Sequence, residues 1–217
     1  MDTNLSRSRY SKKLQITLKL LPFSYNLSFA IITILLMSCS SEEKDYQKEV
    51  NDFRAMKNES FSQPSSSPLS KSELKEFNGL EYFDANSIFK IKAKFVPAKM
   101  PIYVSLFESE DVKQIHVIRG TLSFILGDTI CTLIGYSSTG QGKHSLFIPF
   151  SDTHKSTYPG GRYVDGHLLN DTICLVDFNL SYNPYCVYNE HYKCALTPLS
   201  NRLPVPVPSG EKWQAEH

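Results

Sequence analysis

Phe89-Lys90-Ile91-Lys92-Ala93-Lys94-Phe95 is the stretch of sequence that decides the fold. Apolar side chains alternate with lysines, and this period of two places one set on each face of a β-strand. Similar runs follow at residues 102–107, 115–119, 121–126, 130–136, 146–150 and 172–178. Gly127-Asp128 has glycine at the first central position of a two-residue hairpin turn. The pattern predicts a mainly β domain, an antiparallel meander that closes into a barrel or a sandwich.

The composition limits the classes of protein to consider. The chain has 217 residues, a formal net charge of +1, 41% hydrophobic residues and 21% charged residues. This is enough apolar material for one globular core or two small ones, and it excludes a disordered chain, a collagen and a multi-span membrane protein. Nucleic-acid binders neutralise phosphates with an excess of basic residues, which is absent here, so no nucleic-acid partner is predicted.

The N-terminus has the features of a bacterial lipoprotein signal peptide. A flank with three lysines precedes a mostly apolar run at residues 27–37, which is short for a membrane span. The run ends in Leu36-Met37-Ser38-Cys39, which resembles the lipobox whose cysteine becomes lipidated. We therefore expect a signal peptide at residues 1–38 and a membrane anchor, palmitate included, on Cys39. The alternative is an N-terminal helix that stays attached.

The tract after this cysteine also suits an envelope protein. Ser40-Ser41-Glu42-Glu43-Lys44-Asp45 resembles the acidic tract of surface-exported lipoproteins from Bacteroidetes-type bacteria. We expect attachment to the outer membrane, on its periplasmic side or at the surface. Because the chain after Cys39 is mildly acidic, its membrane contact would come from acyl chains rather than from anionic headgroups.

Two parts follow the signal peptide. Residues 39–69 are expected to hold the lipidated cysteine, a tether and a short amphipathic helix at 45–58 that packs on the domain. The helix is indicated by apolar residues three or four apart, namely Tyr46, Val50, Phe53 and Met56. Residues 70–217 are expected to form the β-rich domain, with Ser70 and Glu73 at capping-box spacing before another short helix.

Polar and aromatic residues are dense in the C-terminal third, where we expect a polar, aromatic-lined site at one end of the sheet. Its candidate ligand-binding residues are Asp152, Tyr158, Arg162, Tyr163, Asp177, Asn179, Tyr182 and Asn183. An Asn beside a turn usually ties the loop to its own backbone, which is the alternative for Asn179 and Asn183.

The charged candidates leave three interpretations open. If they point inward they need partners, and the fork of donors on Arg162 could bridge Asp152 and Asp177. The first interpretation is a site for a small polar ligand, such as a carbohydrate or a cell-wall fragment. The second is a hydrolase with Asp152 and Asp177 as its acid/base pair. The third is a purely structural ion-pair network in a structural or interaction domain.

The cysteines and glycines suggest structural roles. Cys186 and Cys194 favour a disulfide in an exported protein. A metal site with His191 and a nucleophilic thiol are the alternatives, but Cys-x4-His-x2-Cys is not a standard zinc spacing. Cys131 and Cys174 lie in apolar runs and are expected to be buried thiols. No phosphate-loop, cofactor or metal motif is present, so no cofactor or metal is predicted.

Several motifs together resemble a bacterial family of unknown function, catalogued as domain of unknown function 1684. They are Asp177-Phe178-Asn179, Tyr182-Asn183-Pro184, the Cys186/Cys194 pair and Asn201-Arg202-Leu203, in the family's order. Phe77-Asn78-Gly79-Leu80 resembles the family's entry motif. The loop after Asp152 is shorter than the family's. The family has no established activity, so the resemblance implies a kind of protein and no chemistry.

Overall fold

The chain divides into two compact units, Met1–Tyr46 and Gln47–His217. The computed structural model describes residues 23–107, 114–137 and 142–213, with side chains from residue 42 onward. The long helix α1 (Phe23–Ser62) contributes to both units.

Little of the N-terminal prediction falls on described residues. Residues 1–22 of the predicted signal peptide lie outside the described part, as does the side chain of Cys39. Within that part, no helix combines the length and the hydropathy that a membrane span requires.

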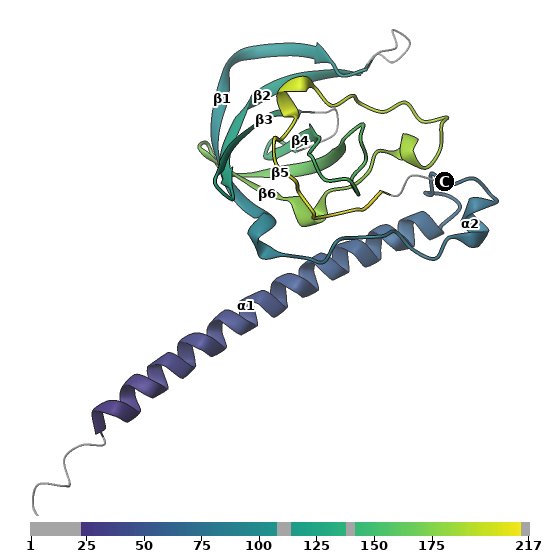
Figure 1. The fold of residues 1–217 in the computed structure, drawn as a ribbon. Helices are drawn as coiled ribbons and strands as arrows, with labels where there is room; N and C mark the ends of the chain where they lie inside the picture. The colour runs from purple at the N-terminus through teal and green to yellow at the C-terminus, as the bar shows by residue number, and fades with distance from the viewer. Residues whose placement is uncertain (1–22, 108–113, 138–141, 214–217) are drawn as a thin grey trace, which may run out of the picture. The chain divides into compact units, whose positions relative to one another are not determined.

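Within the described residues, the second unit is built on six antiparallel strands that close into a barrel (Figure 1). The strands are β1 (Lys90–Ser105), β2 (Ile115–Leu126), β3 (Thr129–Ser137), β4 (Ser145–Phe150), β5 (Arg162–Asn170) and β6 (Ile173–Asp177). The remaining elements are α2 (Glu73–Glu76) and the 3-10 helices η1 (Ser87–Phe89), η2 (Phe178–Leu180), η3 (Tyr185–Val187) and η4 (Leu199–Asn201). Each strand pairs with the next, and β6 pairs with β1. The predicted mainly β meander is confirmed, and it forms a barrel.

The barrel interior is filled by every second side chain along the strands, the set that points inward. In β1, Ala93 and Phe95 are buried while Lys92 and Lys94 are exposed, as the period of two predicts. The interior cluster consists of Phe89, Ala93, Phe95, Leu122, Phe124, Cys131, Leu133, Leu146, Ile148, Phe150, Val164, Cys174, Val176, Phe178, Leu203 and Val207.

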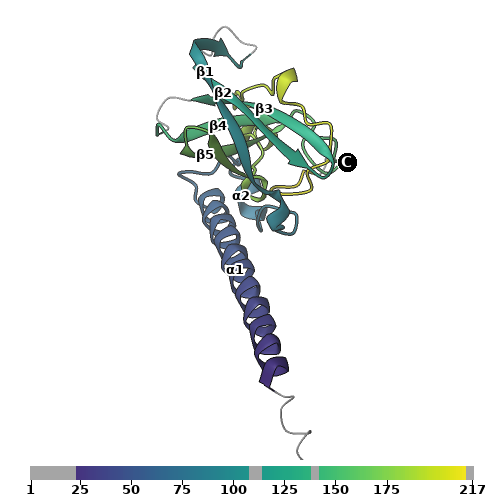
Figure 2. The same ribbon diagram turned by 90° about the vertical axis from the view of Figure 1, so that its left-hand side faces the viewer.

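Two of the predicted strand boundaries are wrong. Residues 102–107 do not start a new strand, because β1 runs on into them, and residues 115–119 are the beginning of β2. The register shifts after Pro97 in β1 and next to Gly120 in β2, and such irregularities bend a strand without ending it. A Cβ at Gly120 would overlap the Val96 carbonyl, so glycine is needed there. In Figure 2 the C-terminal end of β1 and the N-terminal end of β2 extend beyond the other strands.

The alternation does not reveal β5, the strand that carries two of the predicted site residues. Asp165, Gly166 and His167 interrupt its apolar pattern. It is nevertheless paired with β4 from its first residue, with Arg162 opposite Phe150. This pairing directs successive side chains of β5 to opposite faces of the barrel wall.

The C-terminal segment completes the wall between β3 and β4, which pair at one position, Tyr136 with Phe147. Asn201 fills the gap beside that pair. Its Oδ1 accepts from the Ile134 amide at 2.7 Å, and its Nδ2 donates to the carbonyls of Ile134 at 3.0 Å and Pro149 at 2.7 Å. An asparagine side chain therefore replaces part of the missing backbone ladder.

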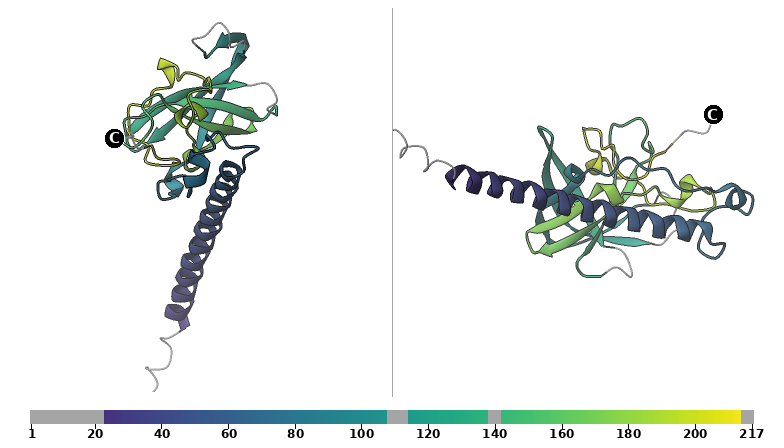
Figure 3. Two further views of the ribbon diagram at one scale, coloured as in Figure 1. Left: turned by 90° about the vertical axis from the view of Figure 1, so that its right-hand side faces the viewer. Right: turned by 90° about the horizontal axis from the view of Figure 1, so that it is seen from below.

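Residues 47–62 of α1 lie along the barrel (Figure 3). The predicted helix at residues 45–58 is confirmed, but it is not short, because α1 runs from Phe23 to Ser62. Its predicted apolar face is only partly right, because Met56 is 64% exposed. The face toward the barrel carries Val50, Arg54, Lys57 and Phe61, at the spacing of one helix stripe.

The capping box before α2 is confirmed. The Ser70 amide donates to Glu73 Oε2 at 2.8 Å, and the Glu73 amide donates to Ser70 Oγ at 3.3 Å.

Candidate functional site

The guanidinium of Arg162 is enclosed by the chain itself. Its Nη2 pairs with Asp152 Oδ2 at 2.9 Å, and both side chains are 1% exposed. It also donates to the carbonyls of Val207 at 2.9 Å, Glu211 at 3.0 Å and Ser209. Burial lowers the pKa of Arg162, against the opposing effect of Asp152. These bonds hold the C-terminal segment against the start of β5.

The Asp152 carboxylate also accepts several hydrogen bonds besides its ion pair with Arg162. Its Oδ1 accepts from the amides of His154 at 2.8 Å and Val207 at 3.2 Å and from the Thr157 hydroxyl at 3.3 Å. The carboxylate therefore organises its own loop and the segment that crosses it, in addition to pairing with Arg162.

Asp177 lies apart from this pair. It caps η2, accepting from the amide and from the Nδ2 of Asn179, both at 3.0 Å. Asn179 also exchanges two hydrogen bonds with the backbone of Asn86, both at 2.9 Å. Asn179 thus ties loops together, as its alternative interpretation predicts.

The predicted bridge from Arg162 to two carboxylates is therefore not the arrangement found in the described chain. Asp152 and Asp177 line neither of the two cavities described below, and nor do Arg162 and Asn179. A hydrolytic acid/base pair must face one cavity, so this geometry gives the hydrolase interpretation no support.

Tyr158 also lies outside both cavities, with its ring edge-on to Trp213 at 5.7 Å between centroids. The other three predicted residues, Tyr163, Tyr182 and Asn183, line the first cavity.

This first cavity has a volume of about 320 Å³. It is lined by Phe107, Gln114, His116, Phe147, Tyr163, Tyr182, Asn183, Pro184, Tyr185, Tyr192, Lys193, Cys194 and Ala195. Leu146 and Ile148 point into the barrel, whereas Phe147 belongs to a second apolar cluster with Tyr163. The cavity therefore lies against the outer face of the barrel wall, rather than at the end of the sheet as the sequence predicts.

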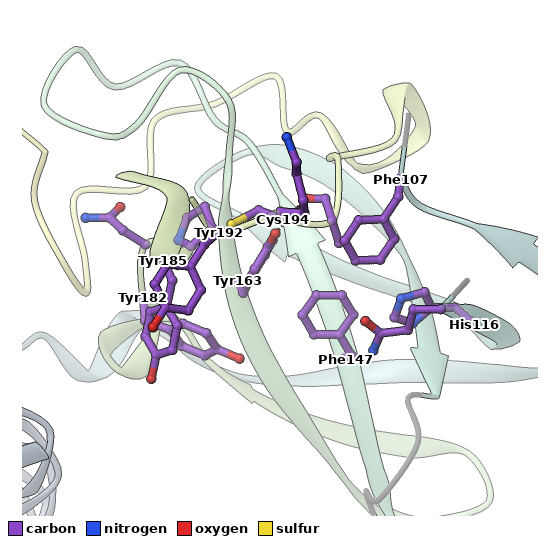
Figure 4. A pocket seen from close by; sticks show the side chains of 13 residues that line it. Phe107, His116, Phe147, Tyr163, Tyr182, Tyr185, Tyr192 and Cys194 are labelled. Carbon is purple, nitrogen blue, oxygen red and sulfur yellow. Dashed lines mark hydrogen bonds between the residues drawn. The ribbon is translucent and has the colours of Figure 1, made fainter. Parts of the chain in front are cut away.

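Aromatic rings line opposite sides of this cavity. In Figure 4, Tyr182, Tyr185 and Tyr192 gather on one side, while Phe107, Phe147 and His116 lie on the other. Nearly perpendicular ring pairs fix these side chains: the centroids of Tyr185 and Tyr192 are 5.3 Å apart at 77°.

Tyr163 lies between the two groups and connects them. Its ring is edge-on to Phe147 at 4.8 Å and to Tyr182 at 5.8 Å. Its hydroxyl donates to the Ala195 carbonyl at 2.6 Å, which holds the outer wall of the cavity against β5.

His116 is a site residue that the sequence did not reveal. It is 2% exposed and lies between two nearly parallel rings, Phe147 at 5.6 Å and Phe107 at 6.2 Å. Within the described part of the chain, neither ring nitrogen has a hydrogen-bond partner. Burial lowers the pKa of His116; the nearby Ser137 backbone opposes the shift without reaching hydrogen-bond geometry. A neutral imidazole thus contributes its ring to the lining of the cavity, while both ring nitrogens are buried.

A second cavity, of about 600 Å³, adjoins the first, and Asn183 lines both. Its other lining residues are Leu69, Glu73, Phe77, Gly79, Leu80, Glu81, Cys186, Val187, Tyr188, Asn189, Glu190, Lys212 and Trp213. Glu211 pairs with Lys57 and accepts from the Asn183 amide, so these two residues position Asn183. The sequence does not predict this contact, because the helix and the tail are far apart along the chain. The one signal for it is the spacing of Val50, Lys57 and Phe61, which indicates an inward helix face.

The four cysteines of the barrel unit are free thiols in the structure. Cys131 and Cys174 are buried in the barrel interior, as predicted. The Cys186 amide donates to Cys194 Sγ at 3.0 Å, so the predicted disulfide partners are neighbours and the disulfide stays a prediction. Among the described residues, no group of three or more His, Cys, Asp and Glu side chains could hold a metal ion.

The family model described as "protein of unknown function (DUF1684)" matches residues 75–212. The chain belongs to this family. An uncharacterized protein of Haloarcula marismortui, whose solution structure was determined by NMR, is similar to it. The two chains are 32% identical, and the match covers 82% of this chain and 99% of the other, with a TM-score of 0.65. A comparison with curated proteins finds no match.

In this DUF1684 protein, the motifs that carry the family resemblance divide between two tasks. Asn179 of the first motif accepts from the Ser209 hydroxyl at 2.9 Å, and Asn201 of Asn201-Arg202-Leu203 bonds to Ile134 and Pro149, so both motifs hold the C-terminal segment on the barrel. Tyr182-Asn183-Pro184 and Cys194 line the aromatic cavity. The second group is therefore the part of the family pattern that reaches a cavity.

Proposed function

We propose that this DUF1684 protein is a cell-envelope lipoprotein that binds a small polar ligand with an apolar face, such as a sugar ring of a cell-wall fragment. The observation that carries the proposal is the cavity of about 320 Å³, with six aromatic side chains and His116 in its lining. Small-molecule sites have volumes of about 300–1,000 Å³ and combine apolar walls with a few polar groups.

The lining also indicates the charge of the ligand. Among the residues that line the aromatic cavity, Lys193 carries the one full charge, and its side chain is exposed. The other polar side chains of the lining are neutral, namely Gln114, Asn183, His116 and the tyrosines. Ring faces beside a few neutral donors and acceptors suit a neutral or weakly anionic ligand that has both C–H faces and hydroxyl or amide groups.

Saturation-transfer NMR on the full-length protein in detergent tests this proposal, with N-acetylglucosamine and its β-1,4 oligomers as probes. We expect transfer to the ring and acetyl protons of the sugar. Tyr192→Ala removes one of the six aromatic rings in the lining and should strongly reduce the signal. Tyr103→Ala is the matched control, since Tyr103 is 68% exposed on β1 and lines neither cavity.

Two results would contradict the proposal. One is the absence of transfer to any of the sugars. The other is equal transfer with the two tyrosine variants, which would place the contact outside the aromatic cavity.

The envelope location rests on the lipobox-like Leu36-Met37-Ser38-Cys39 and has its own test. Cells that express the chain are grown with labelled palmitate, and the membrane fraction is assayed for label and protein. Cys39→Ser should lose the label and leave the protein unprocessed, whereas Ser40→Ala should keep it. Label on the Cys39→Ser chain would show that Cys39 is not the anchor.

A further inference from the structure

Two thiols lie in the partition between the two cavities. Cys194 lines the aromatic cavity of about 320 Å³, and Cys186 lines the neighbouring cavity of about 600 Å³. The Cys186 amide lies 3.0 Å from Cys194 Sγ. Both cysteines are partly exposed, whereas Cys131 and Cys174 are buried in the barrel interior. Reagents can reach the first pair without unfolding the protein.

We propose that Cys186 and Cys194 form a redox modification site, which external disulfides convert reversibly from a dithiol into a disulfide that holds the wall of the aromatic cavity closed. The exchange chemistry follows from the thiol pair alone. Its effect on ligand exchange rests on the function proposed for the aromatic cavity.

The geometry assigns different roles to the two sulfurs. A negative charge on Cys194 Sγ would have a backbone donor already in place, namely the Cys186 amide. Burial, followed by the hydrogen bond to Cys194, raises the pKa of the Cys186 thiol to about 12. Because the Cys186 amide is directed at Cys194 Sγ, we assign Cys194 as the attacking thiol and Cys186 as the resolving thiol.

The exchange proceeds in two steps. Cys194 Sγ attacks one sulfur of an external disulfide such as oxidised glutathione; a new S–S bond forms, the external bond breaks, and one external thiol leaves with the proton from Cys194. Cys186 Sγ then attacks Cys194 Sγ, and the second external thiol leaves with the proton from Cys186. The pair loses two electrons, and the external disulfide gains them.

The bond would act on the cavity through the segment at residues 192–195. Its far end is fixed to the barrel, because Ala195 accepts from the Tyr163 hydroxyl and the Leu196 amide donates to the Leu106 carbonyl, both at 2.6 Å. Its near end meets η3 through the Tyr185–Tyr192 ring pair and the bond between the cysteines. The near end is also held by the Tyr192 amide, which donates to the Asn189 carbonyl at 3.1 Å. A Cys186–Cys194 disulfide would close the stretch between the two cysteines into a short loop and limit its local opening.

The test uses the full-length protein equilibrated with mixtures of reduced and oxidised glutathione, followed by acid quenching, alkylation and mass spectrometry. We expect Cys186 and Cys194 to oxidise together and to be fully reduced again at high reduced glutathione, while Cys131 and Cys174 react only after unfolding. Cys186→Ser should trap one glutathione on Cys194. Cys131→Ala is the matched control and should leave the couple unchanged.

Three results would overturn the proposal. They are no disulfide at a large excess of oxidised glutathione, a disulfide that a large excess of reduced glutathione leaves intact, and glutathione trapped on Cys186 while Cys194 stays free in the wild-type chain.

A second measurement links the couple to the cavity. Amide hydrogen exchange at residues 188–195 should slow by about tenfold or more on oxidation, as expected of a cross-link over a short loop. Exchange of N-acetylglucosamine should slow in parallel. If the sugar never binds, the glutathione titration and the amide exchange still decide the redox site, and only its effect on the ligand fails with the proposed function. Unchanged amide exchange would refute the closing of the wall.

Discussion

Lys57 of α1 forms an ion pair with Glu211 of the C-terminal segment, with 2.5 Å between Nζ and Oε1. The Lys57 side chain is 14% exposed and that of Glu211 is 1% exposed. Lys57 Nζ also lies 4.4 Å from the centre of the Tyr182 ring, and Glu211 Oε2 accepts from the Asn183 amide at 2.7 Å. A helix and a tail that are distant in sequence thus together position two residues of the aromatic cavity.

Removal of one partner from this pair should destabilise the protein strongly. Lys57→Met leaves the Glu211 carboxylate buried without its cation, which typically costs about 3–5 kcal/mol of unfolding free energy. Urea denaturation measures the effect. Lys48→Met is the matched control, because the Lys48–Asp52 pair is 74% and 61% exposed and should contribute less than about 1 kcal/mol. Equal losses in the two variants would mean that the Lys57–Glu211 pair is no better than a surface pair.

Arg162→Ala should lower the melting temperature sharply rather than produce a folded protein without ligand. It leaves the buried Asp152 carboxylate without its cation and three backbone carbonyls without the donor that Arg162 supplies, and the loss of one partner of a buried pair costs about 3–5 kcal/mol. Differential scanning calorimetry measures the shift.

The control for Arg162 is Arg119→Ala, since Arg119 makes an exposed bond to the Lys143 carbonyl and should change stability by less than about 0.5 kcal/mol. A stable Arg162→Ala protein that loses sugar binding would instead restore Arg162 to a ligand-binding role.

Asn201→Asp should weaken the wall between β3 and β4. The carboxylate cannot donate to the carbonyls of Ile134 and Pro149, and each buried acceptor left without a donor costs about 1–3 kcal/mol. Chemical denaturation and hydrogen exchange of β4 measure the effect. Asn170→Asp is a fair comparison, because Asn170 Oδ1 only accepts, from the amide and hydroxyl of Thr172, and a carboxylate keeps both bonds. If the two variants are equally stable, Asn201 does not hold β3 and β4 together.

The regular parts of the barrel could be predicted because each rests on local pattern. The alternation of residues 89–95, the Gly127-Asp128 hairpin and the Ser70–Glu73 capping box involve neighbours in sequence, and all three are present. Asn201 could not be assigned its role in the same way, because its partners lie in strands that are distant along the chain.

The site was harder to predict than the fold for a similar reason. The sequence indicates that Arg162 and Asp152 need partners, but most of these partners are backbone groups of the proline-rich tail, which a sequence does not identify. Tyr163 and Tyr182 were found because aromatic density is visible. The sequence does not identify His116, since the alternation of inward and outward side chains in β2 shifts at the Gly120 bulge.

His116 should make the stability of the protein depend on pH in the mildly acidic range. Burial lowers its pKa, so the folded state binds a proton less readily than the unfolded state, where the pKa is about 6.5. The contribution is fully present above pH 6.5 and is lost as the pH falls from there toward the lowered folded pKa. The rings of Phe107, Tyr136 and Phe147 surround the imidazole, and no charged side chain contributes to the shift.

His116→Phe isolates this contribution, because phenylalanine keeps the ring stack and has no site for a proton. The difference in unfolding free energy between the variant and the wild type should grow as the pH falls from 7 to 5, and His167→Phe, at an exposed position, should not remove the His116 contribution. A constant difference across that range would mean that the imidazole is not held in its neutral form. The same variant separates packing from binding: a protein as stable as the wild type at pH 7 that no longer transfers saturation to N-acetylglucosamine would show that the imidazole contributes to binding beyond its ring packing.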